Sequence, residues 1–152
     1  MSLHQTKHQK VIRLTVDGTN FQAAAGTSDL TSGAVDMQGF ESARFLYCLG
    51  TITSGAVTSI KAQQCDTTGG SYADLLGTSV TVADTDDNKV VSLEIVQPLE
   101  RFLKVVIDRG TQNAVVESLV VILSGSKELP IADDSTTVVG SEVHVSPIEG
   151  TA

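Results

Sequence analysis

The stretch RFLKVVIDRGTQNAVVESLVVIL, residues 101–123, decides the fold class of this chain. In residues 101–108, Leu103, Val105 and Ile107 occupy alternate positions and share one face. This two-residue period is typical of a β-strand with one buried side. Residues 109–113 predict a hairpin loop, and residues 114–123 predict a second strand. That strand ends apolar on both faces, which predicts cover on both, by another sheet or by a partner subunit.

The same alternation recurs towards the N-terminus, and no stretch shows convincing helical periodicity. Gly, Thr, Ser and Asn return every 8–15 residues, which is the punctuation of an all-β domain. Further strands are predicted at residues 11–16, 34–37, 43–49, 57–65, 78–83 and 89–96. Residues 50–55 predict a turn between hairpin partners, residues 66–71 a second turn, and residues 17–32 a loop with at most a short strand. The predicted fold class is all-β: an antiparallel, jelly-roll-like β-sandwich.

The chain of 152 residues fits one domain with two appended termini. We expect an N-terminal arm at residues 1–10, the β-sandwich domain at residues 11–124 and an extended C-terminal tail at residues 125–152. The tail is rich in Ser, Thr, Asp and Gly, with short apolar beads between them. Ordering such a segment costs about 1–2 kcal/mol per residue, so we expect it to serve assembly more than folding.

Composition and charge exclude several classes of function. The net charge is −8, which disfavours binding to nucleic acid. Aromatic residues are 4% of the chain and Trp is absent, which argues against stacking sites for glycans or bases. No signal peptide is expected from the polar first ten residues, and no apolar run has the length that predicts a membrane helix. The first 13 residues carry +3 and residues 127–152 carry −4, so the termini either pair with each other or with neighbours, or are solvated.

The histidines, His4, His8 and His144, all lie in the terminal segments, so none can anchor a catalytic triad in the core. His4 and His8 have the spacing of metal ligands on a helix, but nothing predicts a helix there.

The acidic turn at residues 84–88 begins like a calcium loop, with Asp84, Asp86 and Asn88 at alternate positions. The rest of that motif is missing, since Lys89 and Ile95 stand where Gly and Glu are needed. A solvated turn is the prediction, and a weak cation site is the alternative.

Other chemistry-bearing residues show no catalytic pattern. Cys48 and Cys65 have no metal-ligand spacing; Cys48 is expected to be a buried free thiol, and no bond between the two is expected. Residues 68–71 lack the lysine of a phosphate loop. Two carboxylate pairs, Asp36 with Glu41 and Glu94 with Glu117, are more simply solubilising than catalytic. No catalytic, cofactor-binding or metal-binding residue is predicted, and the chain is not expected to be an enzyme.

Several stretches resemble one family of proteins: DMQGFESARF (36–45), VTSIKAQQ (57–64), YADL (72–75), RFLKV (101–105) and RGTQNAV (109–115). Together they resemble the small capsid decoration, or cement, proteins encoded beside the major capsid gene in tailed bacteriophages. The resemblance covers about residues 35–123 and leaves both termini outside it.

This resemblance implies a structural role in the virion. A decoration protein is made in the host cytoplasm and binds the outer surface of the capsid, where it bridges capsomers and stabilises the shell. Its expected partners are the major capsid protein and copies of itself, as a trimer or dimer, with no cofactor, nucleic acid or membrane. The alternatives are a tail-tube or head–tail connector subunit and a soluble glycan-binding module.

Overall fold

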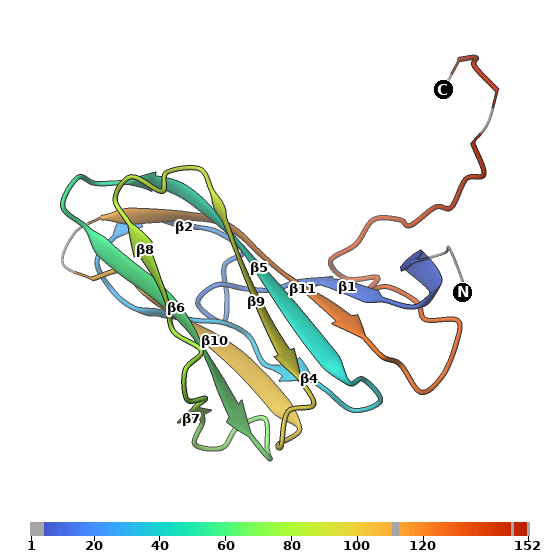
Figure 1. Cartoon of the computed structure of the whole chain (residues 1–152), viewed down its shortest axis with the longest axis horizontal. Helices are drawn as coiled ribbons and strands as arrows, with labels where there is room; N and C mark the ends of the chain where they lie inside the picture. The colour runs from blue at the N-terminus through green and yellow to red at the C-terminus, as the bar shows by residue number, and fades with distance from the viewer. Residues whose placement is uncertain (1–4, 111–112, 147, 152) are drawn as a thin grey trace.

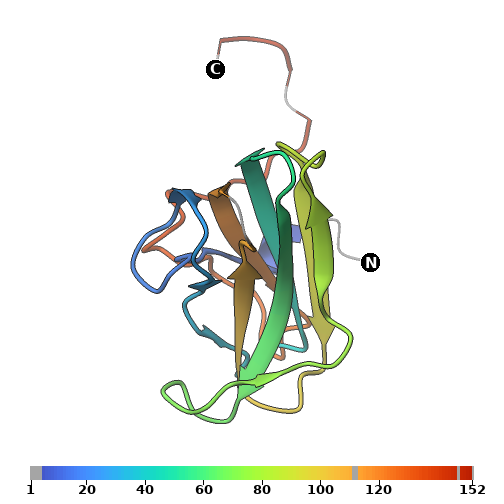
Figure 2. The same cartoon turned by 90° about the vertical axis from the view of Figure 1, so that its left-hand side faces the viewer.

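The computed structural model describes residues 5–110, 113–146 and 148–151. Two antiparallel sheets pack face to face as a sandwich (Figures 1 and 2), which confirms the predicted fold class. The described residues contain no α-helix and one short 3-10 turn, η1 (Gln5–Lys7). No helix among them has the length and apolarity to cross a bilayer.

Eleven strands make up the two sheets of the described chain, and several of them are only two residues long. They are β1 (Lys10–Arg13), β2 (Ala23–Gly26), β3 (Leu30–Thr31), β4 (Val35–Asp36), β5 (Ser42–Ile52), β6 (Val57–Cys65), β7 (Ala73–Asp74), β8 (Val80–Ala83), β9 (Val90–Val96), β10 (Phe102–Asp108) and β11 (Ala114–Ser124).

The strand order is that of a jelly roll. The first sheet runs β1-β11-β5-β9, with β2 also paired to β11. The second runs β3-β10-β6-β7, with β4 beside β10 and β8 beside β6. The short strands β3 and β4 thus act as one interrupted strand along β10, and β7 and β8 as another along β6. The first and last strands of the first sheet, β1 and β11, are neighbours, as the double Greek key requires.

The core lies between the sheets and follows the predicted alternation. Leu103, Val105 and Ile107 of β10 are fully buried, and so are Phe45 and Tyr47 of β5. Apolar area of this kind is worth about 25 cal/mol per Å² removed from water, which makes it the main source of stability.

Both predicted hairpins are wrong. Residues 50–55 do not join paired strands, because β5 lies in one sheet and β6 in the other. Residues 109–113 likewise connect β10 to β11 across the sandwich, and residues 111–112 lie outside the described part of the chain. These two connections therefore carry the chain from one sheet to the other, whereas β6 does pair with β7, the next strand along the chain.

Among the described residues, a sheet covers only one face of strand β11. Leu119, Val121 and Leu123 are buried against the second sheet. Val120 and Ile122 point to the opposite face of the first sheet and are only half-buried. The sequence predicted that both faces of this apolar run are covered. The second sheet of the same chain covers one of them.

Arg109 and Tyr47 both place polar groups in the interior. The guanidinium of Arg109 donates to the carbonyl oxygens of Ser28 (2.8 Å), Ala24 (2.7 Å) and Ala114 (3.1 Å), so it fastens the β2–β3 segment to the sheet. The hydroxyl of Tyr47 is buried without a hydrogen-bond partner among the described residues, and burial raises its pKa to about 12.

Candidate docking surfaces

The residues that the sequence offered as candidates for catalysis or metal binding lie apart in the structure. His8 follows η1 and donates its backbone N–H to Gln5 (2.9 Å), whereas His144 lies in the exposed tail with Nε2 2.8 Å from a carboxylate oxygen of Glu142. His4 lies outside the described residues. In the described ranges, no three His, Cys, Asp or Glu side chains are grouped to hold a metal ion.

The carboxylates of the acidic turn at residues 84–88 accept hydrogen bonds from backbone N–H groups. Asp84 accepts the N–H of Gly55 at 2.7 Å, and Asp87 accepts the N–H of Ile52 at 2.6 Å. Backbone amides therefore occupy oxygens that a calcium ion would need. The turn ties the β5–β6 connection to the β8–β9 connection.

Asp86 completes this pattern. Its carboxylate accepts the N–H of Ala83 (3.0 Å) and pairs with Lys89 (2.7 Å), and the hydrogen bond from Lys89 holds the pKa of Asp86 below its usual range. Asn88 has a φ of 58°, the left-handed conformation that asparagine tolerates in turns.

The first carboxylate pair is not assembled into a site. Asp36 makes two hydrogen bonds to Arg101, at 2.8 and 2.7 Å, which lower the pKa of the carboxyl group. The backbone of Glu41 bridges the ends of two strands, because its N–H donates to Ser124 and its carbonyl accepts from Gln97.

The second pair is held apart by the register of the sheet. Glu94 lies opposite Arg44 near the start of β5 and accepts the hydroxyl proton of Ser42 at 2.5 Å. Glu117 lies on β11 beside the pair of Val116 with Leu49, towards the other end of β5.

The cysteines lie in different sheets, Cys48 in β5 and Cys65 at the end of β6, and both are free. Cys65 is buried, but Cys48 is only half-buried. The expected burial of Cys48 is therefore corrected: Tyr47 and Leu49 face the core, so alternation turns the side chain between them outward.

Cys48 belongs to an apolar strip that crosses the outer face of the first sheet. Three neighbouring pairs compose it. We call these residues the outer strip: Val11 with Ile122, Val120 with Leu46, and Cys48 with Val90. No other strand of the described chain lies on this face. The run at the end of β11 that is apolar on both faces predicted the outer strip. The similar apolar run in β5 was not predicted to contribute to it.

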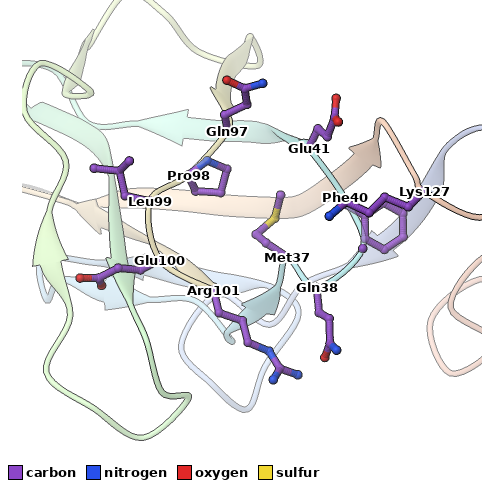
Figure 3. Close-up of a pocket in the computed structure, with 11 residues that line it drawn as sticks. Met37, Gln38, Phe40, Glu41, Gln97, Pro98, Leu99, Glu100, Arg101 and Lys127 are labelled. Carbon is purple, nitrogen blue, oxygen red and sulfur yellow. The ribbon is translucent and has the colours of Figure 1, made fainter.

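A hollow of about 560 Å³ lies at one end of the sandwich, where the β4–β5 and β9–β10 connections meet. Figure 3 shows Phe40 and Lys127 at one end of it and the largely exposed Leu99 at the other. Its lining mixes apolar groups with both signs of charge and includes neither His nor Cys. It offers area for contact rather than an acid–base or nucleophilic centre.

One edge of the first sheet is covered by the C-terminal segment. Val11 donates its N–H to the carboxylate of Asp133 (2.7 Å) and accepts the N–H of Asp134 at its carbonyl (3.3 Å). Arg13 donates its N–H to the hydroxyl of Thr137 (3.1 Å). Both residues point these groups away from β11, so the tail satisfies the outward side of β1.

The opposite edge, β9, is open. The N–H of Leu49 donates to the carbonyl of Lys89, which sets the phase of the ladder between β5 and β9. The backbone groups of Val90, Ser92, Glu94 and Val96 therefore point away from β5. No residue of the described ranges pairs with these groups.

A groove of about 330 Å³ runs beside this open edge, between β8 and β9. Its apolar lining includes Leu49, Val80, Val82 and Val91. Val80 and Val91 pack on the core but remain half-buried, so the sandwich is not closed on this side.

Beyond Val138 the chain makes no further backbone hydrogen bond within the described residues, although residues 139–141 and Val143 still line a pocket with Thr6 and Lys7. Figure 1 shows this last segment running away from the sandwich on the side of β1. We call residues 139–146 and 148–151 the free segment. Val139, Val145 and Ile148 in it are almost fully exposed.

No family model matches this chain, and no curated protein matches it. Among solved structures, it is similar to a chain from work on Bacillus endospore appendages, described as a novel family of disulfide-linked pili. The similarity has a TM-score of 0.40 and 14% identity, and it covers 82% of this chain and 96% of the other. It is distant, and we carry no property of that protein over to this chain.

Proposed function

We propose that this chain is a non-enzymatic structural protein of a virion, a capsid decoration protein that associates with copies of itself. It docks on the major capsid protein at the outer surface of the particle and bridges neighbouring capsomers. The observation that carries the proposal is the outer strip, an apolar band on a sheet face that no other strand of the described chain covers. The sequence resemblance over residues 35–123 supplies the kind of partner.

The size of the strip fits a repeated contact. Stable interfaces bury about 800 Å² on each partner, and six side chains supply only part of that area. A protein that binds at many symmetry-related positions gains from several weak contacts made together. The hollow beside Phe40 and Leu99 offers a second contact on the same molecule.

The test is an image reconstruction of the native particle, combined with rebinding of purified variants to particles stripped of the chain. Val120→Lys places a charge in the middle of the outer strip and should abolish rebinding, while its thermal unfolding stays close to that of the wild type. Leu76→Lys is the matched control, because Leu76 is fully exposed outside the strip, and should rebind normally.

Two results would contradict the proposal. Normal rebinding by Val120→Lys removes the outer strip from the contact. A reconstruction that places the chain in the tail tube or in a connector ring assigns it to that position instead.

A further inference from the structure

The same chain carries an open strand edge and a strand-like segment without a partner. Edge strands of soluble proteins are commonly blocked by proline, by a bulge or by several charges. Strand β9 has seven residues, no proline, an unbroken register with β5 and a single charged side chain, Glu94. It is therefore unprotected on its outward side.

The first part of the free segment has the sequence of a strand. From Val139 to Ser146 the residues read VGSEVHVS, so that Val139, Ser141, Val143 and Val145 fall on one face. The other face is Gly, Glu, His and Ser. In this structure the segment is extended and pairs with no strand of the described chain. Pro147 follows directly and is suited to ending a strand.

The two features match in length and in pattern. Eight residues of strand span about 26 Å, and the seven residues of β9 span about 23 Å. On β9, Val91, Leu93 and Ile95 form a half-buried inward row, and the outward row is more polar, with Ser92 and Glu94 in it. A strand added with its valines inward would extend the apolar row over the groove between β8 and β9.

We propose that residues 139–146 of one copy add as an extra strand to the β9 edge of a second copy. This inference deepens the self-association in the proposed function and rests on it. The added strand receives backbone hydrogen bonds from β9 and buries its three valines in the β8–β9 groove, the mode of recognition known as β-augmentation.

The occupant is a second copy because of where the tail is anchored. Asp133, Asp134 and Thr137 fasten it to β1, which lies at the far edge of the sheet from β9. To reach its own β9, the segment would have to fold back across the sheet face that carries the outer strip. It instead leaves the domain on the β1 side (Figure 1).

Each copy then has one strand to give and one edge to receive. Such a heterologous contact closes into a ring where the rotation between copies allows it, and otherwise continues as an open chain.

The experiment is a complementation test with two full-length variants in sedimentation velocity. The tail variant Val143→Asp/Val145→Asp has a damaged donor and an intact edge. The edge variant Ser92→Pro has an intact donor but loses an outward N–H that makes no bond to β5. Each should sediment as a monomer alone at concentrations where the wild type associates, and an equimolar mixture should form a dimer and nothing larger.

Matched controls are Glu142→Gln/His144→Ser on the polar face of the segment and Ser92→Thr on β9, and both should associate as the wild type does. Wild-type association by the tail variant and the edge variant would overturn the inference, and so would a mixture that stays monomeric. A monomeric wild type whose own tail protects β9 would also overturn it. Capsid rebinding is measured separately with Val120→Lys, so failure of the donor strand is distinguishable from failure of docking.

Discussion

Strands β1 and β9 end the same sheet at opposite edges, and the chain treats them differently. The outward backbone groups of Val11 and Arg13 on β1 are bonded to the segment around residues 133–137. The corresponding groups of β9 have no partner among the described residues. The tail covers the β1 edge, from which it departs, and the β9 edge stays uncovered in the described part of the chain. Of these two edges, a strand of another copy could therefore pair only with β9.

The comparison also divides the C-terminal tail into two parts. Residues 127–138 bond to the body, since the N–H of Lys127 donates to Gly39 (3.1 Å) and that of Ile131 donates to Lys7 (3.1 Å). The free segment makes no backbone hydrogen bond to the body among the described residues. Folding and assembly are thus expected to depend on different parts of the tail.

The largest effect should come from cutting the tail at two places. A chain ending at Ser126 loses three hydrogen bonds to β1, each worth about 1 kcal/mol, and should lose about 2–4 kcal/mol of unfolding free energy. A chain ending at Val138 should stay within about 0.5 kcal/mol of the wild type and lose only self-association. Urea titration measures both. Equal stability of the two truncated chains would show that residues 127–138 do not cover β1 in solution.

Proline substitution tests the edges directly, because it removes one outward N–H from each. Val11→Pro deletes the bond to Asp133 and should cost about 1–3 kcal/mol. Ser92→Pro deletes an N–H without a partner and should cost under about 1 kcal/mol, including the loss of the exposed hydrogen bond from Arg44 to the Ser92 hydroxyl. Denaturant midpoints would show the difference, and a greater loss for Ser92→Pro would reverse the assignment of the two edges.

A smaller effect is expected from single hydroxyl groups of the covering segment. Thr137→Val removes the acceptor for the N–H of Arg13 and should cost about 1 kcal/mol. Thr136→Val is the control, because its hydroxyl bonds only to the carboxylate of Asp134, and it should cost a few tenths of that. Equal losses would mean that Thr137 acts within the turn rather than on β1.

The covered edge should also loosen in acid. Hydrogen bonds from the hydroxyls of Thr137 and Thr136 hold the pKa of Asp134 below its usual value of 3.8. A lowered pKa stabilises the fold above about pH 4, and that contribution is lost as the pH falls through the lower folded value. The exchange rate of the Val11 and Arg13 amides, followed by NMR from pH 5 to pH 3, should rise relative to that of core amides. A constant ratio would leave Asp134 without a role in holding the tail.

Sequence reasoning found the layers but not their connections. The alternation of Leu103, Val105 and Ile107 predicts which side chains are buried, because burial on one face depends only on the period of a strand. It cannot say which sheet receives the strand, since strands of both layers alternate in the same way. Gly50 and Gly55 favoured the prediction of a hairpin, but a turn rich in Gly can equally well connect strands of different sheets.

The docking surfaces were predictable only in part. The doubly apolar end of β11 indicated an outer contact, and the tail was recognised as a separate segment. The sequence did not predict that the tail covers β1, because nothing distinguishes Asp133 and Thr137 from ordinary solvated loop residues. They meet β1 only once the fold joins positions more than 120 residues apart.

The pairing of β1 with β11 also bears on how the protein is made. Lys10 and its partner Leu123 are separated by most of the chain, so contact order is high and folding belongs to the slow, non-local class. A ribosome adds about 5–20 residues per second, so the first strand waits several seconds before its neighbour exists. Asp133 and Thr137 emerge later still, and only then is the covered edge sealed. The first sheet therefore cannot be completed, nor its β1 edge covered, until synthesis of the domain is nearly finished.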